Sequence, residues 1–227
     1  MTTAIMVGPH ADHPRPGPLA PYETALRDGG PLYLVRTDGR REPLDVDRWK
    51  AAADTADETL LARCAGPTLD IGCGPGRLVA ALVRRGTPAL GIDLAATAVR
   101  LTVHAGGAAL RRSVFDPLPG EGRWSSALLA DGNIGIGGDP EALLTRTAAL
   151  LRRDGVLLVE TDPRNPDRSE RFAARVEDAA GHRGTPFRWA ALGLHALERL
   201  APTCGFKTTG TWHTDDRAFA ELIRIGV

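Results

Sequence analysis

The stretch LDIGCGPGR, residues 69–77, decides which fold the sequence predicts. It opens as a short apolar strand, turns through glycines at positions 72, 74 and 76, and leads into an apolar helix pattern over residues 78–83. Glycines let the backbone turn tightly and approach a ligand, and a helix start presents free N–H donors and a partial positive charge. The stretch therefore indicates a ligand-binding turn at the carboxyl end of a strand.

The pattern of strand, turn and helix repeats beyond this turn. Further strands are expected at 89–93, 110–115, 126–130 and 156–160, and helices at 95–105 and 139–155. Two final strands are expected at 206–213 and 218–227, joined by a turn at 214–216. Strands that alternate with helices predict an open, mostly parallel sheet with helices on both faces.

The rest of the chain is long enough to cover a ligand. Residues 1–21 are rich in proline and glycine and predict a flexible arm. Residues 22–66 are expected to form a lid, with one helix over 45–65. The segment that turns at Asp38-Gly39 could be a small hairpin or a loop packed on the body. Residues 67–227 would form the main domain. Within it, residues 162–193 would be a substrate-covering insertion with a hairpin that turns at 181–184, and a helix would follow at 195–203.

The composition excludes several classes of protein. The 227 residues carry 28 Lys+Arg and 28 Asp+Glu, so no basic surplus is available for a nucleic acid. We expect neither a membrane span nor a signal peptide, because no uninterrupted apolar stretch is long enough and the N-terminus lacks the signal pattern. Cys64, Cys73 and Cys204 are odd in number and lie in no metal-binding spacing, so we expect no metal site and a cytoplasmic location.

Two classes of cofactor compete for the glycine turn. The dinucleotide fingerprint G-x-G-x-x-G/A fits poorly, because the third glycine, Gly76, comes one position early and Arg77 stands where a small residue is needed. Asp70, just before the turn, would repel a phosphate but attract an ammonium group. An NAD(P)-binding oxidoreductase is therefore the weaker of the two enzyme hypotheses.

An acidic residue followed by G-x-G-x-G is the first motif of the class I S-adenosylmethionine-dependent methyltransferases, and LDIGCGPGR resembles that motif in full. The resemblance extends from about residue 67 to about residue 161. It implies a Rossmann-like α/β fold: a mostly parallel seven-stranded sheet with helices on both faces, an antiparallel last strand and a small N-terminal lid. It also implies methyl transfer from S-adenosylmethionine to a small-molecule acceptor, with an O or N nucleophile favoured over C and specialised metabolism as the expected setting.

The resemblance further implies a set of cofactor-binding residues. Asp70 would favour the ammonium group, Asp93 would accept the ribose hydroxyls, and Leu94 would lie against the adenine. Asp116 would accept the adenine amino group, and Asp131 would face both the methionyl part and the acceptor. The full set is Asp70, Gly72, Cys73, Gly74, Asp93, Leu94, Asp116 and Asp131.

Candidates for acceptor chemistry are fewer. The run ADGNIGIGG, residues 130–138, departs from the Asn/Asp-Pro-Pro-aromatic motif of amine-methylating relatives, which argues against methylation of adenine, cytosine or glutamine amides. Asp131 and His195 are the candidate catalytic residues, and Asn133 could hydrogen-bond an acceptor. An apolar pocket could be formed by Tyr22, Tyr33, Trp49, Trp124 and Trp189, although aromatic residues more often belong to cores or interfaces. A binding protein of the same fold without catalysis is the remaining alternative.

Overall fold

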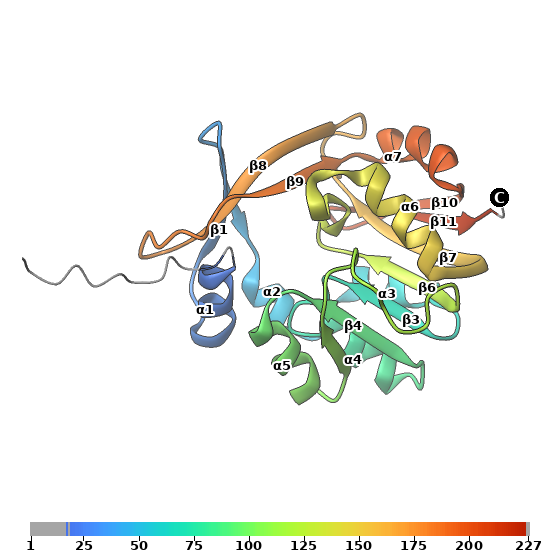
Figure 1. Ribbon diagram of the computed structural model, residues 1–227, viewed down its shortest axis with the longest axis horizontal. Helices are drawn as coiled ribbons and strands as arrows, with labels where there is room; N and C mark the ends of the chain where they lie inside the picture. The colour runs from blue at the N-terminus through green and yellow to red at the C-terminus, as the bar shows by residue number, and fades with distance from the viewer. Residues whose placement is uncertain (1–16, 18, 226–227) are drawn as a thin grey trace, which may run out of the picture.

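A seven-stranded sheet forms the body of the computed structural model, which describes residues 17 and 19–225 (Figure 1). The strand order is β10-β11-β7-β6-β3-β4-β5. The strands are β3 (Thr68–Ile71), β4 (Ala89–Asp93), β5 (Ala108–Arg111), β6 (Trp124–Leu129), β7 (Leu151–Thr161), β10 (Phe206–Thr214) and β11 (Arg217–Arg224). Strands β5, β4, β3, β6 and β7 pair in parallel, whereas β11 runs antiparallel to both β7 and β10. The predicted Rossmann-like fold with an antiparallel last strand is confirmed.

Helices cover both faces of this sheet. The alternating apolar residues of β6 and β7 divide between two cores, as expected for strands that are buried on both sides. One core contains side chains of α6 (Pro140–Leu150) and α7 (Leu194–Leu200), and the other contains side chains of α3 (Thr55–Leu61) and α4 (Arg77–Arg84). The five parallel strands run in the same direction between these cores, so their carboxyl ends meet at one edge of the sheet.

A second, four-stranded antiparallel sheet lies across that edge, and we call it the lid sheet. Its order is β2-β1-β8-β9, with β1 (Leu32–Arg36), β2 (Arg41–Leu44), β8 (Ser169–Asp178) and β9 (Phe187–Leu192). Both predicted hairpins are present, and β1 pairs with β8 so that Leu34 lies opposite Val176. The N-terminal segment and the segment after β7 therefore build one continuous cover.

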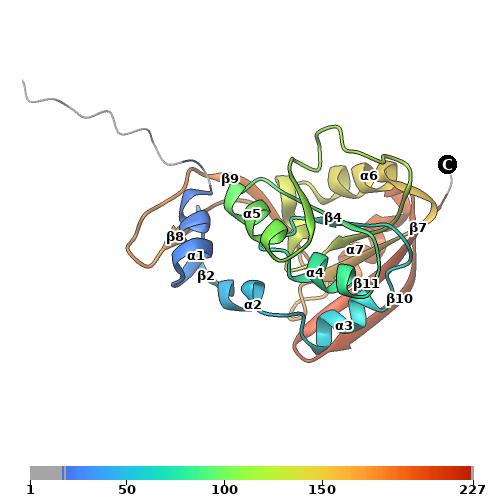
Figure 2. The ribbon, with the colours of Figure 1, turned by 90° about the horizontal axis from the view of Figure 1, so that it is seen from below.

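The first helix, α1 (Ala20–Asp28), joins the lid sheet to the main body. It lies beside α5 (Ala96–His104) and also packs on β8 (Figure 2). The Glu23 Oε1 atom accepts the Thr97 N–H at 3.1 Å, so the carboxylate of α1 satisfies a free donor in the first turn of α5. This contact anchors the cover over the strand ends.

Several predicted boundaries are wrong for local reasons. The single helix predicted over 45–65 is two, α2 (Val46–Lys50) and α3, because Ala51 is extended and Asp54 starts a new helix through a capping box with Asp57. The strand predicted over 110–115 ends at Arg111.

The ends of the chain and the tail helix also differ from prediction. Helix α1 begins inside the predicted arm, whose residues 1–16 and 18 lie outside the described part. The helix predicted over 195–203 is α7 followed by a 3₁₀ turn, η2 (Ala201–Cys204). The final strand predicted over 218–227 is β11, which ends at Arg224, and residues 226–227 lie outside the described part.

Within the described ranges, no helix has the length and apolar character needed to cross a bilayer.

Substitution of Gly76, the N-cap residue of α4, tests the local packing of the glycine turn. The φ of Gly76 is +91°, and a Cβ atom there would lie 2.7 Å from the Thr102 backbone. Gly86 also has positive φ but has no neighbour within 4 Å. We expect Gly86→Ala to cost about 1–2 kcal/mol through backbone strain alone. Gly76→Ala should cost about 1–3 kcal/mol more because Thr102 must move. Urea unfolding of both variants measures the difference, and equal losses would contradict this packing.

Candidate functional site

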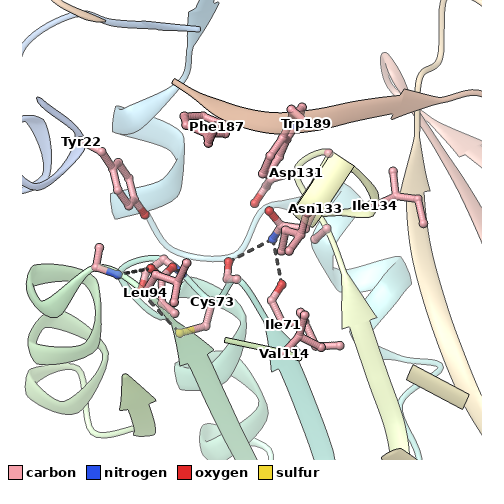
Figure 3. A pocket seen from close by; sticks show the side chains of 18 of the residues that line it. Tyr22, Ile71, Cys73, Leu94, Val114, Asp131, Asn133, Ile134, Phe187 and Trp189 are labelled. Atoms are coloured by element: carbon pink, nitrogen blue, oxygen red, sulfur yellow. Dashed lines mark hydrogen bonds between the residues drawn. The ribbon is translucent and has the colours of Figure 1, made fainter. Parts of the chain in front are cut away.

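A cavity of about 1210 Å³ lies between the carboxyl ends of the strands and the lid sheet (Figure 3). The glycine turn and the residues that follow β4, β5, β6 and β7 form its floor. Residues of α1, α2 and the lid sheet form its roof. Ligands of open α/β sheets bind at this edge, so the cavity is the candidate site.

The glycine turn is held in place by hydrogen bonds from two sides. The Gly72 N–H donates to Ile92 O at 2.8 Å, and the Asn133 Nδ2 atom donates to Ile71 O and Gly72 O, both at 3.0 Å. A Cβ atom at Gly72, where φ is +74°, would lie 2.7 Å from Asn133 Nδ2. The amide nitrogen of Asn133 therefore orients the turn, and the expectation that Asn133 could hydrogen-bond an acceptor stays a prediction.

Asp70 is a buried carboxyl group that lines the cavity. Its Oδ2 atom has no hydrogen-bond partner among the described residues. Burial, with smaller contributions from the charges of Asp131 and Asp93, raises the pKa of Asp70 to about 8. A cationic group bound beside it would supply the missing partner and favour the ionised form.

Asp93 also lines the cavity and holds the backbone around it. Its Oδ2 atom accepts the Gly74 N–H at 3.0 Å, and Oδ1 accepts the Ala95 N–H at 2.8 Å. Burial raises the pKa of Asp93, and the hydrogen bonds from Ala95 and Gly74 partly offset that effect. Each oxygen keeps a second lone pair for a ligand hydroxyl. The neighbouring Leu94 lines the cavity with 54% of its surface exposed, which leaves an apolar face open to a flat ligand.

Two further predicted cofactor residues are engaged within the protein. The exposed Asp116 accepts the Ser113 N–H through Oδ2 at 3.0 Å and so closes the turn after β5, although it still lines the cavity. The Cys73 sulfur lies 3.7 Å from Thr102 Oγ1, and burial raises the pKa of the thiol. Cys73 is therefore a packed, protonated side chain.

Asp131 lies on the cavity floor between two arginines. Its Oδ1 atom accepts Arg48 Nη2 at 2.7 Å, and its Oδ2 atom accepts Arg77 Nη2 at 2.6 Å. Its φ is +54°, and its N–H donates to Glu160 Oε2 at 2.7 Å. A carboxylate with two charged donors is held in place and is well placed to orient its neighbours.

Asp131 belongs to a larger group of paired charges that we call the charge network. Arg77 also bonds the fully buried Asp57, which in turn accepts Arg217 Nη1 at 2.8 Å. Burial opposes ionisation of Glu160, but the hydrogen bonds and charge of Arg217 outweigh it and lower the pKa of Glu160. The members are Arg48, Asp54, Asp57, Arg77, Asp131, Glu160 and Arg217.

The structure does not bring His195 to the cavity. Its side chain is 54% exposed on α7, with Nδ1 3.5 Å from Asp167 Oδ2, and it is not among the lining residues. A histidine at the start of a tail helix lies near a lid only if that helix faces the strand ends, and α7 packs on one face of the sheet instead. The predicted catalytic position of His195 is therefore wrong.

Sequence reasoning missed the arginines and part of the aromatic lining. Arg48 and Arg217 reach partners that are far away in the chain, so no local spacing marks them. Phe172 and Phe187 had a usable signal, because alternation in a hairpin places every second residue on one face.

Comparison with known proteins rests on structure alone. No family model matches the chain, and no curated protein matches it in sequence. A methyltransferase from Bacteroides fragilis, solved with S-adenosylhomocysteine, superposes with a TM-score of 0.74 at 20% identity, over 93% of this chain and 96% of that one. The chain has the fold of the S-adenosylmethionine-dependent methyltransferases.

Two other solved structures of this fold are methyltransferases that are named after a small molecule. The 1,6-didemethyltoxoflavin-N1-methyltransferase of Burkholderia thailandensis has a TM-score of 0.60 at 19% identity, over 99% of this chain and 94% of that one. A sugar N-methyltransferase from a Streptoalloteichus species has a TM-score of 0.56 at 16% identity, over 75% and 85%. The TM-scores show a shared fold, and at these sequence identities the likeness shows the fold alone.

Arg77 is the member of the charge network whose loss we expect to be most damaging. Arg77→Met should lower the free energy of unfolding by about 3 kcal/mol, the low end for a broken buried pair, because Arg217 and Arg48 still bond its two partners. Arg84→Met changes an exposed residue of the same helix and should cost less than ~0.5 kcal/mol. Denaturant unfolding of both variants tests this, and a similar small loss for both would contradict a stabilising network.

The buried carboxyl of Asp70 should make stability depend on pH. Its pKa is raised from 3.8 to about 8, so the folded protein keeps a proton that the unfolded chain releases. This contribution is fully present below about pH 4, declines as pH rises, and is lost above about pH 8. We therefore expect Asp70→Asn to match the wild type near pH 4 and to exceed its unfolding free energy by at least ~2 kcal/mol at pH 8. A constant difference between the two proteins from pH 4 to pH 8 would contradict the shifted pKa.

Proposed function

We propose that this chain is an S-adenosylmethionine-dependent methyltransferase that acts on a small-molecule acceptor. The observation that carries the proposal is the unpartnered, buried carboxyl of Asp70 at the cavity wall beside the glycine turn. A group in this position needs a cationic ligand, and the methionyl ammonium of the cofactor supplies one. The shared fold supports the same conclusion.

The residues around Asp70 fit the remaining parts of this cofactor. Asp93 retains lone pairs for the ribose hydroxyls, and exposed Leu94 offers a flat apolar contact to the adenine. Asp116 lines the same end of the cavity and is proposed to face the adenine amino group. Gly72, Cys73 and Gly74 would pass along the methionyl part.

The size of the cavity supports a second, small ligand. Sites for one ligand usually occupy roughly 300–1,000 Å³. The cavity here is about 1210 Å³ and is lined by residues of the lid sheet as well as by the proposed cofactor residues. The Burkholderia neighbour was solved with a small acceptor and S-adenosylhomocysteine together, which agrees with two ligands in one site.

The proposed mechanism depends on placement and exclusion of water. The bound cofactor would supply a methyl group on a sulfonium, which is a good leaving group, so the protein mainly aligns the reacting atoms. Asp131 is proposed as a positioning residue that holds the floor near the acceptor, because hydrogen bonds from its two arginine partners fix both carboxylate oxygens. The lid sheet would keep water out.

Two alternatives have weaker support. Arg77 is directed into the charge network and Asp70 lacks a partner, and neither feature suits the pyrophosphate of an NAD(P)-binding oxidoreductase. A binding protein without catalysis would not need space for a second ligand. An O or N nucleophile, a role in specialised metabolism and a cytoplasmic location stay predictions.

Calorimetric titration with S-adenosylhomocysteine and with NAD tests the proposed cofactor. We expect saturable one-to-one binding of S-adenosylhomocysteine and none of NAD. Asp93→Asn should weaken binding by about tenfold or more, because hydrogen bonds to a charged acceptor contribute roughly 1.5–3 kcal/mol.

Asp139→Asn is the matched control for this titration. Asp139 caps α6 outside the cavity, and asparagine caps a helix equally well, so this variant should bind like the wild type. Absence of saturable binding, or equal affinity for Asp93→Asn and wild type, would reject the proposed cofactor site.

A further inference from the structure

The aromatic residues of this chain are concentrated at the cavity. The sequence contains 5 Phe, 4 Trp and 2 Tyr, only 5% of its residues. More than half of them line this one space: Tyr22, Trp49, Phe115, Phe172, Phe187 and Trp189. Aromatic residues are usually distributed between cores and interfaces. Their concentration at one cavity therefore bears on the chemical class of the ligand that binds there.

The lid sheet lines the cavity mostly with apolar side chains, together with the charged Glu42 and Arg188. Phe172 lies opposite Trp189 in the register of β8 and β9, and Phe187 shares the face of Trp189 because strand side chains alternate. Leu34 and Val176, paired across β1 and β8, continue this face. The face therefore consists of ring and aliphatic surface over most of its width.

Two pairs of perpendicular rings stand above the glycine turn. Phe187 and Trp189 have ring centroids 5.8 Å apart at 80°, and Tyr22 and Trp49 have centroids 5.9 Å apart at 83°. Figure 3 shows Tyr22 on one side of the turn, with Phe187 and Trp189 on the other. Each pair offers one ring face and one ring edge, the two surfaces that a planar aromatic ligand uses for stacking and edge contacts.

Trp189 is fixed next to the proposed site of transfer. A Cβ atom at Gly135, two residues after Asn133, would lie 2.6 Å from Trp189 Nε1. The indole therefore packs directly on the loop that follows Asp131. Its position is set by backbone contact, so its ring can serve as a stable stacking surface.

The carboxylates on this side of the cavity are paired with arginines. Asp131 accepts Arg48 and Arg77, Glu160 accepts Arg217, and Asp162 accepts Arg168 Nη1 at 2.7 Å. Glu42 lies 4.0 Å from that same Arg168. Paired carboxylates leave little attraction for a cationic acceptor, so the balance favours an uncharged one.

The cavity also lacks an evident proton acceptor for the transferred site. None of the histidines in the described part of the chain is among its lining residues. The hydrogen bonds and charge of Arg217 lower the pKa of Glu160 in spite of burial. Burial raises the pKa of Tyr22 and keeps its phenol neutral. The acceptor atom must therefore carry its own nucleophilic lone pair at neutral pH.

We propose that the acceptor is a planar, uncharged aromatic or heteroaromatic ring, bound against Trp189, Phe187 and Tyr22 beneath the lid sheet, with a nucleophilic ring nitrogen or readily ionised hydroxyl as the methylated atom. This proposal rests on the proposed function and specifies its acceptor. The acceptor lone pair forms the new bond to the methyl carbon as the sulfur–carbon bond of the donor breaks. The sulfur keeps that electron pair, and any proton of the acceptor leaves to water.

Binding of defined probes tests the proposed acceptor class. The probes are 2-naphthol, its saturated analogue decahydro-2-naphthol, and decahydroquinolinium as a non-planar cation. Each is titrated calorimetrically into the full chain, with and without saturating S-adenosylhomocysteine. We expect 2-naphthol to bind at least about tenfold more tightly than either saturated probe, because two stacking contacts each add to burial of surface.

Variants then locate the binding surface. Trp189→Leu, and independently Phe187→Leu, should weaken 2-naphthol binding by about threefold to tenfold. Both should leave S-adenosylhomocysteine binding unchanged, because neither ring belongs to the proposed cofactor half. Trp124→Leu is the matched control, since Trp124 lies outside the cavity with its indole N–H bonded to Pro119 O. Thermal unfolding identifies a variant that fails to fold. If either Trp189→Leu or Phe187→Leu fails to fold, the remaining variant of the two tests the binding surface.

Three results would overturn the proposed acceptor class. They are equal affinity for planar and saturated neutral probes, tighter binding of the cationic probe, and an effect of Trp124→Leu as large as that of Trp189→Leu. Failure of the proposed function is a separate result. In that case S-adenosylhomocysteine does not bind. The preference for planar probes is still measured in the titrations that contain no S-adenosylhomocysteine.

Discussion

The buried guanidinium of Arg77 is the interaction on which the rest of the site depends. It stands at the first position of α4, directly after the glycine turn, and bonds both Asp57 of α3 and Asp131 after β6. The positive charge of Arg77 is thus paired with carboxylates from two other parts of the chain. A buried arginine without partners would be very costly, so the turn, the N-terminal helices and the cavity floor are fixed together.

This constraint explains how a small protein builds a covered site. The charge network holds α2 and α3 against the strand ends, and the capping contact of Glu23 holds α1 against α5. Strand β1 can then pair with β8, although the two lie far apart in the chain. The lid sheet needs both segments, and the cavity is lined by residues of this cover and of the main body.

The sequence predicted the main sheet well because each signal was local. The glycine turn, the apolar strand of residues 156–160 and the Asp139-Pro140 helix start carry their own information. The proposed cofactor residues follow from the same motif and stay predictions. The break between α2 and α3 was missed because apolar spacing continued across Ala51, whereas the capping box at Asp54 decided the helix start.

What could not be predicted depends on contacts between distant segments. The pairing of β1 with β8, the arginines that bond Asp131 and the amide of Asn133 on the glycine turn have no signature in sequence spacing. His195 was misplaced because its helix packs on the face of the sheet and not on its edge. The rings that line the acceptor half gather only when both lid segments fold together.

The central claim is that one cavity binds a cofactor at the strand ends and leaves an aromatic-lined space beneath the lid sheet. A crystal structure with S-adenosylhomocysteine is the most direct measurement. We expect the amino group of the ligand at Asp70, its ribose at Asp93, its adenine against Leu94, and an open space between Tyr22 and Trp189. A ligand bound away from Asp70 and Asp93, or one that fills the space beneath Trp189, would contradict the account.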